Sequence, residues 1–247
     1  MRKIHLVMPM AGGGTRFETV GYTLPKPLIE IQGKPFFYWA VQSIVHFAEV
    51  EDITFVVLQN HIDNFHIDDK IHEFYPDAKL KVIPQVLNGA VLTCMNGVAD
   101  IHDDLPILFN DCDHAFTSIP FFEFLKTGDF SKPDAALLTF HSDEPCYSYV
   151  RFCENGRVMG TVEKEVVSSD AICGAYYFRK RKIFEEAAQL YLHNCDYQEF
   201  FMSGIYNKVL ELGQTVHTFS TDLHLSFGTP DEYRMISASP NFLKFER

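Results

Sequence analysis

The chain has 247 residues, of which 47% are hydrophobic, and its formal net charge is −12 at pH 7. This length fits one large α/β domain, or one domain with a small insertion. The acidic balance excludes an overall basic surface for nucleic acid, so cations that bind a polyanion must be concentrated locally. Apolar runs stay well short of the roughly 18 residues that a membrane-spanning helix needs, and we expect no membrane partner.

The six cysteines form no C-x-x-C pair and share no zinc-finger spacing with histidines. We therefore expect free thiols and a cytoplasmic protein. Arg2 and Lys3 precede an apolar run, as in a signal peptide. His5 and Pro9 interrupt that run, so we do not expect a targeting segment.

The first half of the chain alternates aliphatic runs with helix-like segments. In chain order, the predicted elements are a strand over Ile4–Met8, a helix over Pro35–Phe47, strands over Ile53–Leu58 and Leu80–Ile83, a short helix over Ala90–Ala99, and strands over Leu105–Phe109 and Ala135–Phe140. Proline suits the first turn of a helix, which places Pro35 there. Such alternation favours a parallel sheet with helices on both faces.

The second half has closely spaced strands, followed by helices. The predicted elements are strands over Ser148–Cys153, Val158–Glu163 and Ile172–Phe178, helices over Ile183–Leu192 and Glu199–Leu212, and a strand over Val216–Phe219. Residues 154–157, Glu-Asn-Gly-Arg, predict a hairpin turn. Thr229-Pro230-Asp231-Glu232 predicts a helix start with a capping box. The chain contains no internal repeat or low-complexity linker, which favours a single domain.

The most informative motif follows the first predicted strand. The strand runs into Ala11-Gly12-Gly13-Gly14-Thr15-Arg16, and Lys26 follows in Pro25-Lys26-Pro27. Consecutive glycines expose backbone N–H groups that suit a phosphate chain. Arg16 and Lys26 add positive charge, and Lys34 and Lys164 are further candidates for a local cation cluster. A P-loop string is absent, and Phe17 stands where a dinucleotide fingerprint needs its third glycine. The motif predicts a phosphate-handling enzyme.

An acidic pair follows the strand predicted over Leu105–Phe109. Asp111 and Asp113 project to the same side of an extended chain, with Cys112 facing away. Ligands of open α/β sheets bind at the carboxyl ends of strands, where the glycine motif also lies. Hard carboxylates beside phosphates suit Mg²⁺, so the pair is a candidate metal site.

The glycine motif, followed by Pro-Lys-Pro, resembles the signature of the sugar-1-phosphate nucleotidylyltransferases, or NDP-sugar pyrophosphorylases, although the usual spacer before the final glycine is shortened. The resemblance implies a three-layer α/β/α, Rossmann-like nucleotidyltransferase fold of the GT-A type, with a mixed and mostly parallel sheet. It implies one domain over residues 1–247, in which residues 1–115 bind the nucleotide and residues 116–247 bind the acceptor.

The resemblance also assigns roles to individual residues. It implies that Arg16 and Lys26 are catalytic, and that Asp113, with Asp111 as the secondary candidate, holds Mg²⁺. The implied nucleotide-binding residues are Ala11, Gly12, Gly13, Gly14, Thr15, Gln85 and Gly89. The implied acceptor-binding residues are Glu163, Lys164 and Gly174.

The chain departs from the family pattern at Ser226. Many members of the family carry a second metal-binding aspartate there, two residues before the glycine of the motif at residues 228–232. A hydroxyl does not replace the charge of a carboxylate, and Asp222 lies nearby at the wrong offset. Two readings stay open: Asp111 supplies the second carboxylate, or the metal is held more loosely.

The resemblance implies an enzyme that joins an NTP to a sugar phosphate, or a similar small phosphate, and releases pyrophosphate, with polysaccharide biosynthesis as the setting. One alternative is a cytidylyltransferase for a non-sugar phosphate. Another is a GT-A glycosyltransferase that uses an NDP-sugar donor, and a third is a non-catalytic nucleotide-binding protein. The sequence leaves open the NTP, the acceptor and whether the chain forms a homo-oligomer.

Overall fold

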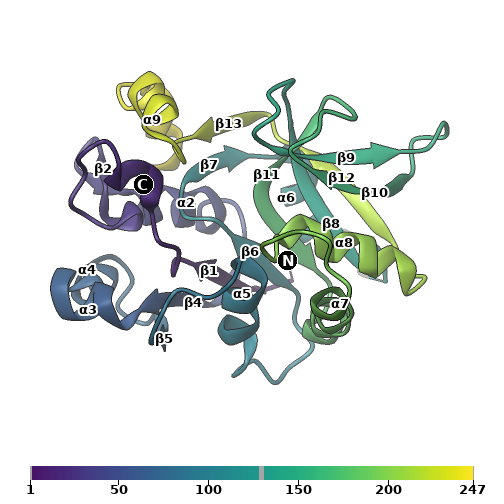
Figure 1. Cartoon of the computed structure of the whole chain (residues 1–247), viewed down its shortest axis with the longest axis horizontal. Coiled ribbons are helices and arrows are strands. Elements are labelled where there is room, and N and C mark those ends of the chain that lie inside the picture. Colours follow the sequence, from purple (N-terminus) through teal and green to yellow (C-terminus); the bar gives the residue numbers. More distant parts are fainter. Residues whose placement is uncertain (1, 128–130, 247) are drawn as a thin grey trace.

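The computed structural model describes residues 2–127 and 131–246 (Figure 1). A nine-stranded sheet runs through the molecule in the order β10-β9-β11-β6-β1-β4-β5; β8 branches from β11, and β12 pairs with β8. Its strands are β1 (Ile4–Pro9), β4 (Val50–Leu58), β5 (Lys79–Ile83), β6 (Ile107–Asn110), β8 (Ala135–His141), β9 (Ser148–Phe152), β10 (Val158–Glu163), β11 (Asp170–Phe178) and β12 (Val216–Ser220).

The strand pairing confirms the mixed sheet. β1 is parallel to β4 and β6, β4 is parallel to β5, and β12 is parallel to β8. β11 is antiparallel to β6, β8 and β9, so it joins the strands of the two halves into one sheet. Two further pairs stand outside this sheet: β2 (Glu30–Ile31) with β3 (Lys34–Pro35), and β7 (His114–Thr117) with β13 (Leu223–Ser226).

Helices cover both faces of the sheet, as the predicted three-layer α/β/α fold requires. Along β1, Leu6 and Met8 pack with one buried cluster and Val7 with the other, because side chains alternate across a strand. One cluster includes side chains of α5 (Ala90–Val98), α7 (Arg181–His193) and α8 (Met202–Glu211). The other includes side chains of α2 (Phe36–Val45), α4 (Ile67–Phe74) and α6 (Ile119–Thr127).

The C-terminal segment returns to pack on the first half of the chain. Helix α9 (Pro230–Ile236) and the 3₁₀ turn Pro240–Phe245 lie beside α2, and the ring centroids of Trp39 and Phe242 are 4.8 Å apart. The predicted capping box is confirmed. The N–H of Glu232 donates to Thr229 Oγ1 at 3.2 Å, and the N–H of Thr229 donates to Glu232 Oε2 at 2.8 Å. This box anchors the loop that brings Glu232 to the site described below.

Several element boundaries differ from the predictions. The helix predicted from Pro35 begins at Phe36, because Pro35 has extended backbone and pairs with Glu30 in the small β2–β3 sheet. The helix predicted from Glu199 begins at Met202, after the extended residue Phe201. The strand predicted from Leu105 begins at Ile107.

The following helices and strands were not predicted from the sequence: α1 (Thr15–Glu18), α3 (Gln59–Phe65), α4, α6, β2, β3, β7 and β13. The six cysteines are free thiols, as predicted. Among the described residues, helices that are both long and apolar enough to cross a bilayer are absent.

Candidate functional site

The glycine motif forms one wall of a cavity at the carboxyl end of β1. Gly14 adopts a left-handed conformation, with φ of 63°, immediately before the short helix α1 (Thr15–Glu18). Lys26 begins the 3₁₀ turn Lys26–Leu28 on the same side. The cavity measures about 460 Å³, and its lining includes these predicted residues: Ala11, Gly12, Gly13, Gly14, Thr15, Lys26, Gly89, Asp111 and Asp113. Nine residues predicted from separate motifs therefore meet at one surface.

A smaller cavity of about 190 Å³ shares Asp111 and Asp113 with the first. Arg16 and Gly174 line this smaller cavity, and the Arg16 side chain is exposed to solvent. The two carboxylates thus stand at the junction between a larger and a smaller compartment. We call the first the glycine-loop cavity and the second the small cavity.

Lys26 and Asp113 form an ion pair at this junction. Lys26 Nζ donates to Asp113 Oδ2 at 2.7 Å, and the two side chains are 29% and 21% exposed. Burial alone would lower the pKa of Lys26, but the charge of Asp113 raises that pKa above its ordinary value. Burial would raise the pKa of Asp113, but the charge of Lys26 lowers it. Asp113 is therefore ionised and Lys26 protonated at pH 7.

Asp111 has no such partner. Burial, together with the neighbouring charge of Asp113, raises the pKa of Asp111 to about 7. Its backbone is fixed, because the N–H of Asp111 donates to the carbonyl of Gly174 at 2.9 Å. One lysine therefore faces two carboxylates, and its single positive charge does not balance them.

Two glycines allow close approach to these carboxylates. A Cβ atom at Gly174 would lie 2.9 Å from Asp111 Oδ2, and one at Gly228 would lie 2.6 Å from Asp113 Oδ2. A third glycine, Gly89, has φ of 97°, and its Cβ would lie 2.4 Å from the backbone nitrogen of Phe200. Larger residues at these positions would displace the carboxylates or the loop, which explains the glycines physically.

Ser226 stands beside a carboxylate rather than replacing one. Its hydroxyl donates to Glu232 Oε1 at 2.8 Å, and the hydroxyl of Tyr147 donates to the same oxygen. Glu232 lines the small cavity, and a Cβ atom at Gly228 would lie 3.6 Å from Glu232 Oε2. The fold therefore supplies negative charge near the position where the sequence pattern lacks it.

Two histidines border the same cavity: His114 is buried and His224 is half-buried. Burial lowers the pKa of His114 to about 4 and that of His224 to about 3, so both rings are neutral at pH 7. His114 is only 2% exposed.

Four predicted residues lie outside both cavity linings. Gln85 is exposed on the loop before Gly89. Glu163 accepts hydrogen bonds from Ser148, at 2.6 Å, and from Ser203.

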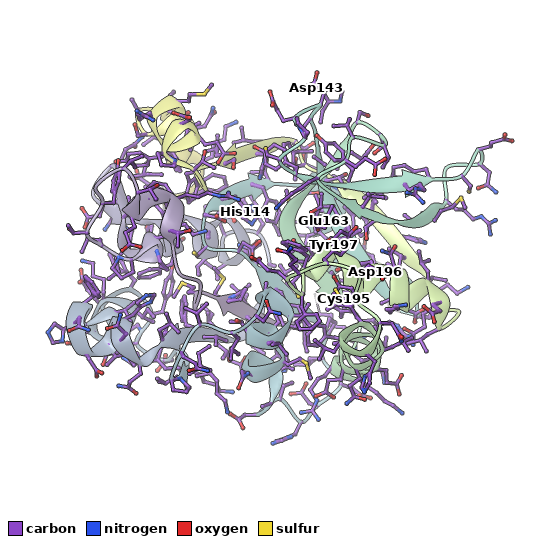
Figure 2. The ribbon with its side chains drawn as sticks, viewed as in Figure 1. His114, Asp143, Glu163, Cys195, Asp196 and Tyr197 are labelled. Atoms are coloured by element: carbon purple, nitrogen blue, oxygen red, sulfur yellow. The ribbon has the colours of Figure 1, made fainter. Side chains whose placement is uncertain are left out.

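Figure 2 shows Tyr197 close to Glu163, whose N–H donates to the Tyr197 hydroxyl at 3.4 Å. Lys164 has positive φ and lies over the ring of Phe201, 5.4 Å from its centroid. Lys34 lies over the rings of Tyr38 and Phe74 rather than joining a cation cluster.

Other lining residues carried no sequence signal for this site. Thr93 and Glu199 line the glycine-loop cavity, and Phe140, Tyr147 and His224 line the small cavity. Glu199 was predicted only as the start of a helix that resembles a mainly architectural segment of the family, and His224 lay between predicted elements. Their distance in the chain from the glycine motif explains why spacing did not reveal them.

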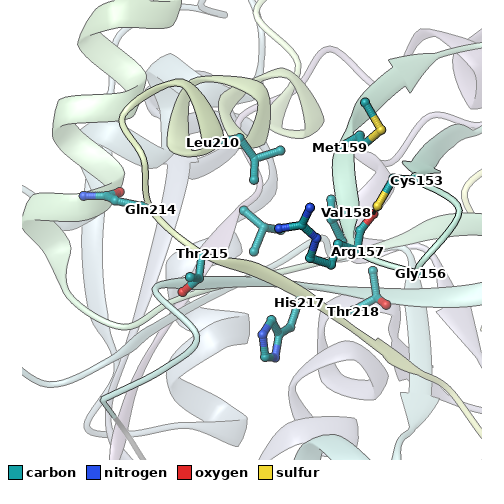
Figure 3. A pocket seen from close by; sticks show the side chains of 11 residues that line it. Cys153, Gly156, Arg157, Val158, Met159, Leu210, Gln214, Thr215, His217 and Thr218 are labelled. Carbon is teal, nitrogen blue, oxygen red and sulfur yellow. Dashed lines mark hydrogen bonds between the residues drawn. The ribbon is translucent and has the colours of Figure 1, made fainter.

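A further cavity, larger than these two, lies elsewhere (Figure 3). It measures about 690 Å³ and opens between the β9–β10 hairpin, the end of α8 and β12. Its lining residues are Cys153, Gly156, Arg157, Val158, Met159, Leu210, Gln214, Thr215, Val216, His217 and Thr218. This lining contains no carboxylate, so the cavity offers no counterpart of the acidic junction.

The comparison with protein families gives one match over nearly the whole chain. Residues 6–239 match the family described as nucleotidyl transferase. A curated relative, a putative UTP–glucose-1-phosphate uridylyltransferase of Methanocaldococcus jannaschii, is 31% identical over 87 residues. That alignment covers 32% of this chain and 30% of the relative.

Solved structures match over the full fold. A nucleoside-diphosphate-sugar pyrophosphorylase from Vibrio cholerae RC9 has a TM-score of 0.78 and 22% identity, and the match covers 97% of this chain and 99% of that one. An inositol-1-phosphate CTP transferase from T. maritima has a TM-score of 0.76 and 16% identity, covering 99% and 95%. At these identities the structural likeness establishes the fold.

Proposed function

The chain belongs to the nucleotidyl transferase family, and from that premise we propose that it joins an NTP to a sugar phosphate, or a similar small phosphate, with release of pyrophosphate. The observation that carries the proposal is the junction of the two cavities. Lys26, paired with Asp113, faces Asp111 between the glycine motif and the small cavity. The glycine-loop cavity would hold the NTP, and the small cavity would hold the acceptor.

In the proposed reaction an oxygen of the acceptor phosphate attacks the α-phosphorus of the NTP. The bond from the α-phosphorus to the bridging oxygen breaks, and pyrophosphate leaves with the electron pair. The nucleophile is already an anion, so no strong base is needed, and catalysis rests on positioning and charge neutralisation. Lys26 would bind the α-phosphate, where negative charge builds in the transition state.

Arg16 is the exposed cation nearest to the glycine motif in sequence. It follows Thr15, which lines the glycine-loop cavity, and it lines the small cavity itself. Arg16 would hold the β- and γ-phosphates, which become the leaving group, if its exposed side chain turns from the small cavity toward the glycine motif. Lys164 lies outside both cavity linings, over the ring of Phe201, and would contact the acceptor phosphate by extending toward the small cavity.

The acidic junction fits Mg²⁺. Asp111 and Asp113 offer hard oxygen ligands, and the pKa of Asp111 is raised first by burial and then by the charge of Asp113, which one lysine does not offset. Asp113 and Asp111 would hold the ion, which supplies Lewis-acid neutralisation of phosphate charge when bound. Glu232 would add negative charge beside Ser226, the position where many family members carry a second metal-binding aspartate.

A second candidate is a cytidylyltransferase for a small non-sugar phosphate. The volume of the small cavity, about 190 Å³, favours a compact acceptor, and this observation does not separate a sugar from a small alcohol. A GT-A glycosyltransferase is disfavoured, because it would bind a diphosphate donor and would not need Arg16 and Lys26 beside the glycine motif. We place the reaction in the cytoplasm, in agreement with six free thiols, and its product in polysaccharide biosynthesis.

The test is pyrophosphate release in the presence of Mg²⁺, with a panel of NTPs against a panel of phosphorylated acceptors. The proposal predicts release that requires both one NTP and one acceptor. Release of nucleoside diphosphate from an NDP-sugar donor would instead establish a glycosyltransferase. If NTP binds in a Mg²⁺-dependent way and no pair releases pyrophosphate, the Ser226→Asp variant distinguishes a site disabled at that position from an acceptor absent from the panel.

A further inference from the structure

We propose that His114, Cys173 and His224 form a Zn²⁺ site in the wall of the small cavity. Each residue offers one ligand atom, and these three atoms lie within 4.8 Å of one another. Within residues 2–127 and 131–246, this is the group of three or more histidine, cysteine and acidic side chains whose ligand atoms lie close enough to share one metal ion. The proposal concerns a different site from the acidic junction and does not depend on the proposed reaction.

The three residues come from three strands in two sheets. His114 begins β7, His224 lies on the partner strand β13, and Cys173 lies on β11 of the main sheet. Cys173 stands where the pairing of β11 with β8 is interrupted, between Ile172 and Tyr176. An ion held by these residues would tie the small β7–β13 sheet to the main sheet.

The imidazole rings are already fixed in place by aromatic neighbours. The ring of His224 packs on Phe140 with centroids 4.1 Å apart, and the ring of His114 is nearly parallel to Phe116, at 5.7 Å and 10°. Fixed rings lose little freedom when they bind a metal, so the site is partly preorganised.

The ring nitrogens make no well-formed hydrogen bond among the described residues. Both nitrogens of His114, and Nε2 of His224, are buried without a partner at hydrogen-bond distance and angle, although backbone of Gly174 lies near the first ring and backbone of Cys173 near the second. A buried polar group without a well-formed hydrogen bond destabilises a fold, so these nitrogens are retained at a cost to stability. A ligand that accepts nitrogen lone pairs would remove that cost.

The chemical types of the three ligand atoms indicate which metal ion the site would bind. Two imidazole nitrogens and one thiolate suit Zn²⁺, whereas Mg²⁺ prefers the carboxylate oxygens of the neighbouring junction. On binding, the Cys173 thiol loses its proton to solvent and its sulfur bonds to the ion. Three protein ligands leave the fourth tetrahedral position open, and all three residues line the small cavity. The fourth ligand would therefore be a water.

The test uses Co²⁺ as a spectroscopic substitute for Zn²⁺. The full chain, stripped with a chelator, is titrated with Co²⁺ in excess Mg²⁺. We expect one equivalent to bind, with a thiolate charge-transfer band in the near ultraviolet and strong tetrahedral bands in the visible. Zn²⁺ should displace the Co²⁺ and abolish both. Absence of the thiolate band, or its loss to Mg²⁺ competition, would overturn the proposal.

Variants assign the ligands. Cys173→Ser should remove the charge-transfer band, while Cys146→Ser, which changes an exposed thiol lining the same cavity, should keep it. His224→Gln should keep the thiol and weaken Co²⁺ binding by at least about tenfold. Circular dichroism checks that each variant is folded, and if Cys173→Ser is not, His224→Gln decides. Equal binding by wild type and His224→Gln would contradict the site.

Discussion

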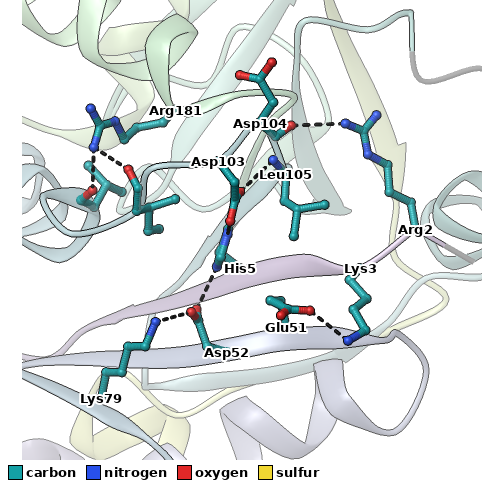
Figure 4. Close-up of polar contacts among 12 residues, drawn as sticks. Arg2, Lys3, His5, Glu51, Asp52, Lys79, Asp103, Asp104, Leu105 and Arg181 are labelled. Carbon is teal, nitrogen blue, oxygen red and sulfur yellow. Dashed lines mark hydrogen bonds and ion pairs between the residues drawn. The ribbon is translucent and has the colours of Figure 1, made fainter.

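The two ends of the parallel strands differ in how completely their polar and charged side chains are paired. At the amino end, His5 of β1 is bonded on both ring nitrogens, through Nδ1 to Asp52 at 2.7 Å and through Nε2 to Asp103 at 2.9 Å (Figure 4). Lys79 also binds Asp52, and the N–H of Leu105 donates to Asp103 at 2.8 Å. At the carboxyl end, one lysine faces two carboxylates, and the rings of two histidines have unpartnered nitrogens.

From this difference we infer that the charged groups at the amino end stabilise the fold, whereas those at the carboxyl end bind a ligand. The network around His5 is complete within the chain, so a ligand would have nothing to add there. At the carboxyl end, one lysine does not balance two carboxylates and histidine nitrogens lack well-formed hydrogen bonds. A bound cation and a phosphate chain would supply the missing partners. Natural sequences keep such locally unfavourable arrangements mainly at functional sites.

The largest expected effect is on catalysis at the carboxyl end. Lys26→Ala should lower kcat by about a hundredfold, because it removes a charge from the transition state. Steady-state pyrophosphate release, with the substrate pair found in the panel, measures this. The matched control is Lys34→Ala, since Lys34 packs on Tyr38 and Phe74 outside both cavities. A Lys26→Ala enzyme with unchanged kcat would remove Lys26 from the proposed role.

The next effect is on stability at the amino end. His5→Ala should lower the free energy of unfolding by about 2 kcal/mol, because hydrogen bonds to two carboxylates are lost in a buried position. Urea unfolding at pH 6 measures the change, while kcat should stay near that of the wild type. A variant as stable as the wild type would show that the network contributes nothing.

The contribution of His5 should also depend on pH. Burial alone would lower the pKa of His5, but its bonds to Asp52 and Asp103 raise it, while the pKa values of both aspartates are lowered. A raised histidine pKa stabilises the fold fully below about 6.5, and the effect is lost as pH rises through the folded-state value. The lowered aspartate values stabilise it above about 4.

The stability difference between wild type and His5→Ala should therefore be larger at pH 5.5 than at pH 9. Urea unfolding at both values measures this difference. The same difference at both pH values would mean that the His5 charge does not contribute to the network.

The smallest effect is a gain at the carboxyl end. Burial and Asp113 raise the pKa of Asp111 to about 7, so ionised Asp111 destabilises the fold as pH rises through that value. Asp111→Asn should therefore raise the free energy of unfolding at pH 8 by about 1 kcal/mol without ligand. Asp134→Asn is the contrasting control and should destabilise, because Asp134 is paired with Arg179 and accepts from Thr215.

The sequence predicted what is local in the chain. Strands such as β1 and β4 are buried on both faces, so each is a continuous apolar run that is visible without a structure. The capping box of α9 was predicted from four consecutive residues and is confirmed. β7 and β13 were not predicted, because each has only four residues; β7 begins with a histidine, and a histidine interrupts the apolar pattern of β13.

The site was predictable only where its residues lie in motifs. The glycine motif, Lys26 and the two aspartates line one cavity, as their positions at strand ends indicated. Glu232 was predicted only as a capping residue, yet it also accepts from Ser226, six residues earlier, and from Tyr147, which is distant in sequence. The contact with Tyr147 follows from how loops within the second half pack together, and a single sequence does not record that packing.

The most direct test of the account measures the stability of wild type and Asp111→Asn with and without ligand. Urea unfolding at pH 8 gives the free energy of unfolding of each, first alone and then with Mg²⁺ and the NTP that reacts. The account predicts a reversal: Asp111→Asn is the more stable protein alone, and the wild type is the more stable one with Mg²⁺–NTP. If Asp111→Asn is more stable under both conditions, the carboxyl end is not completed by a cation and a nucleotide.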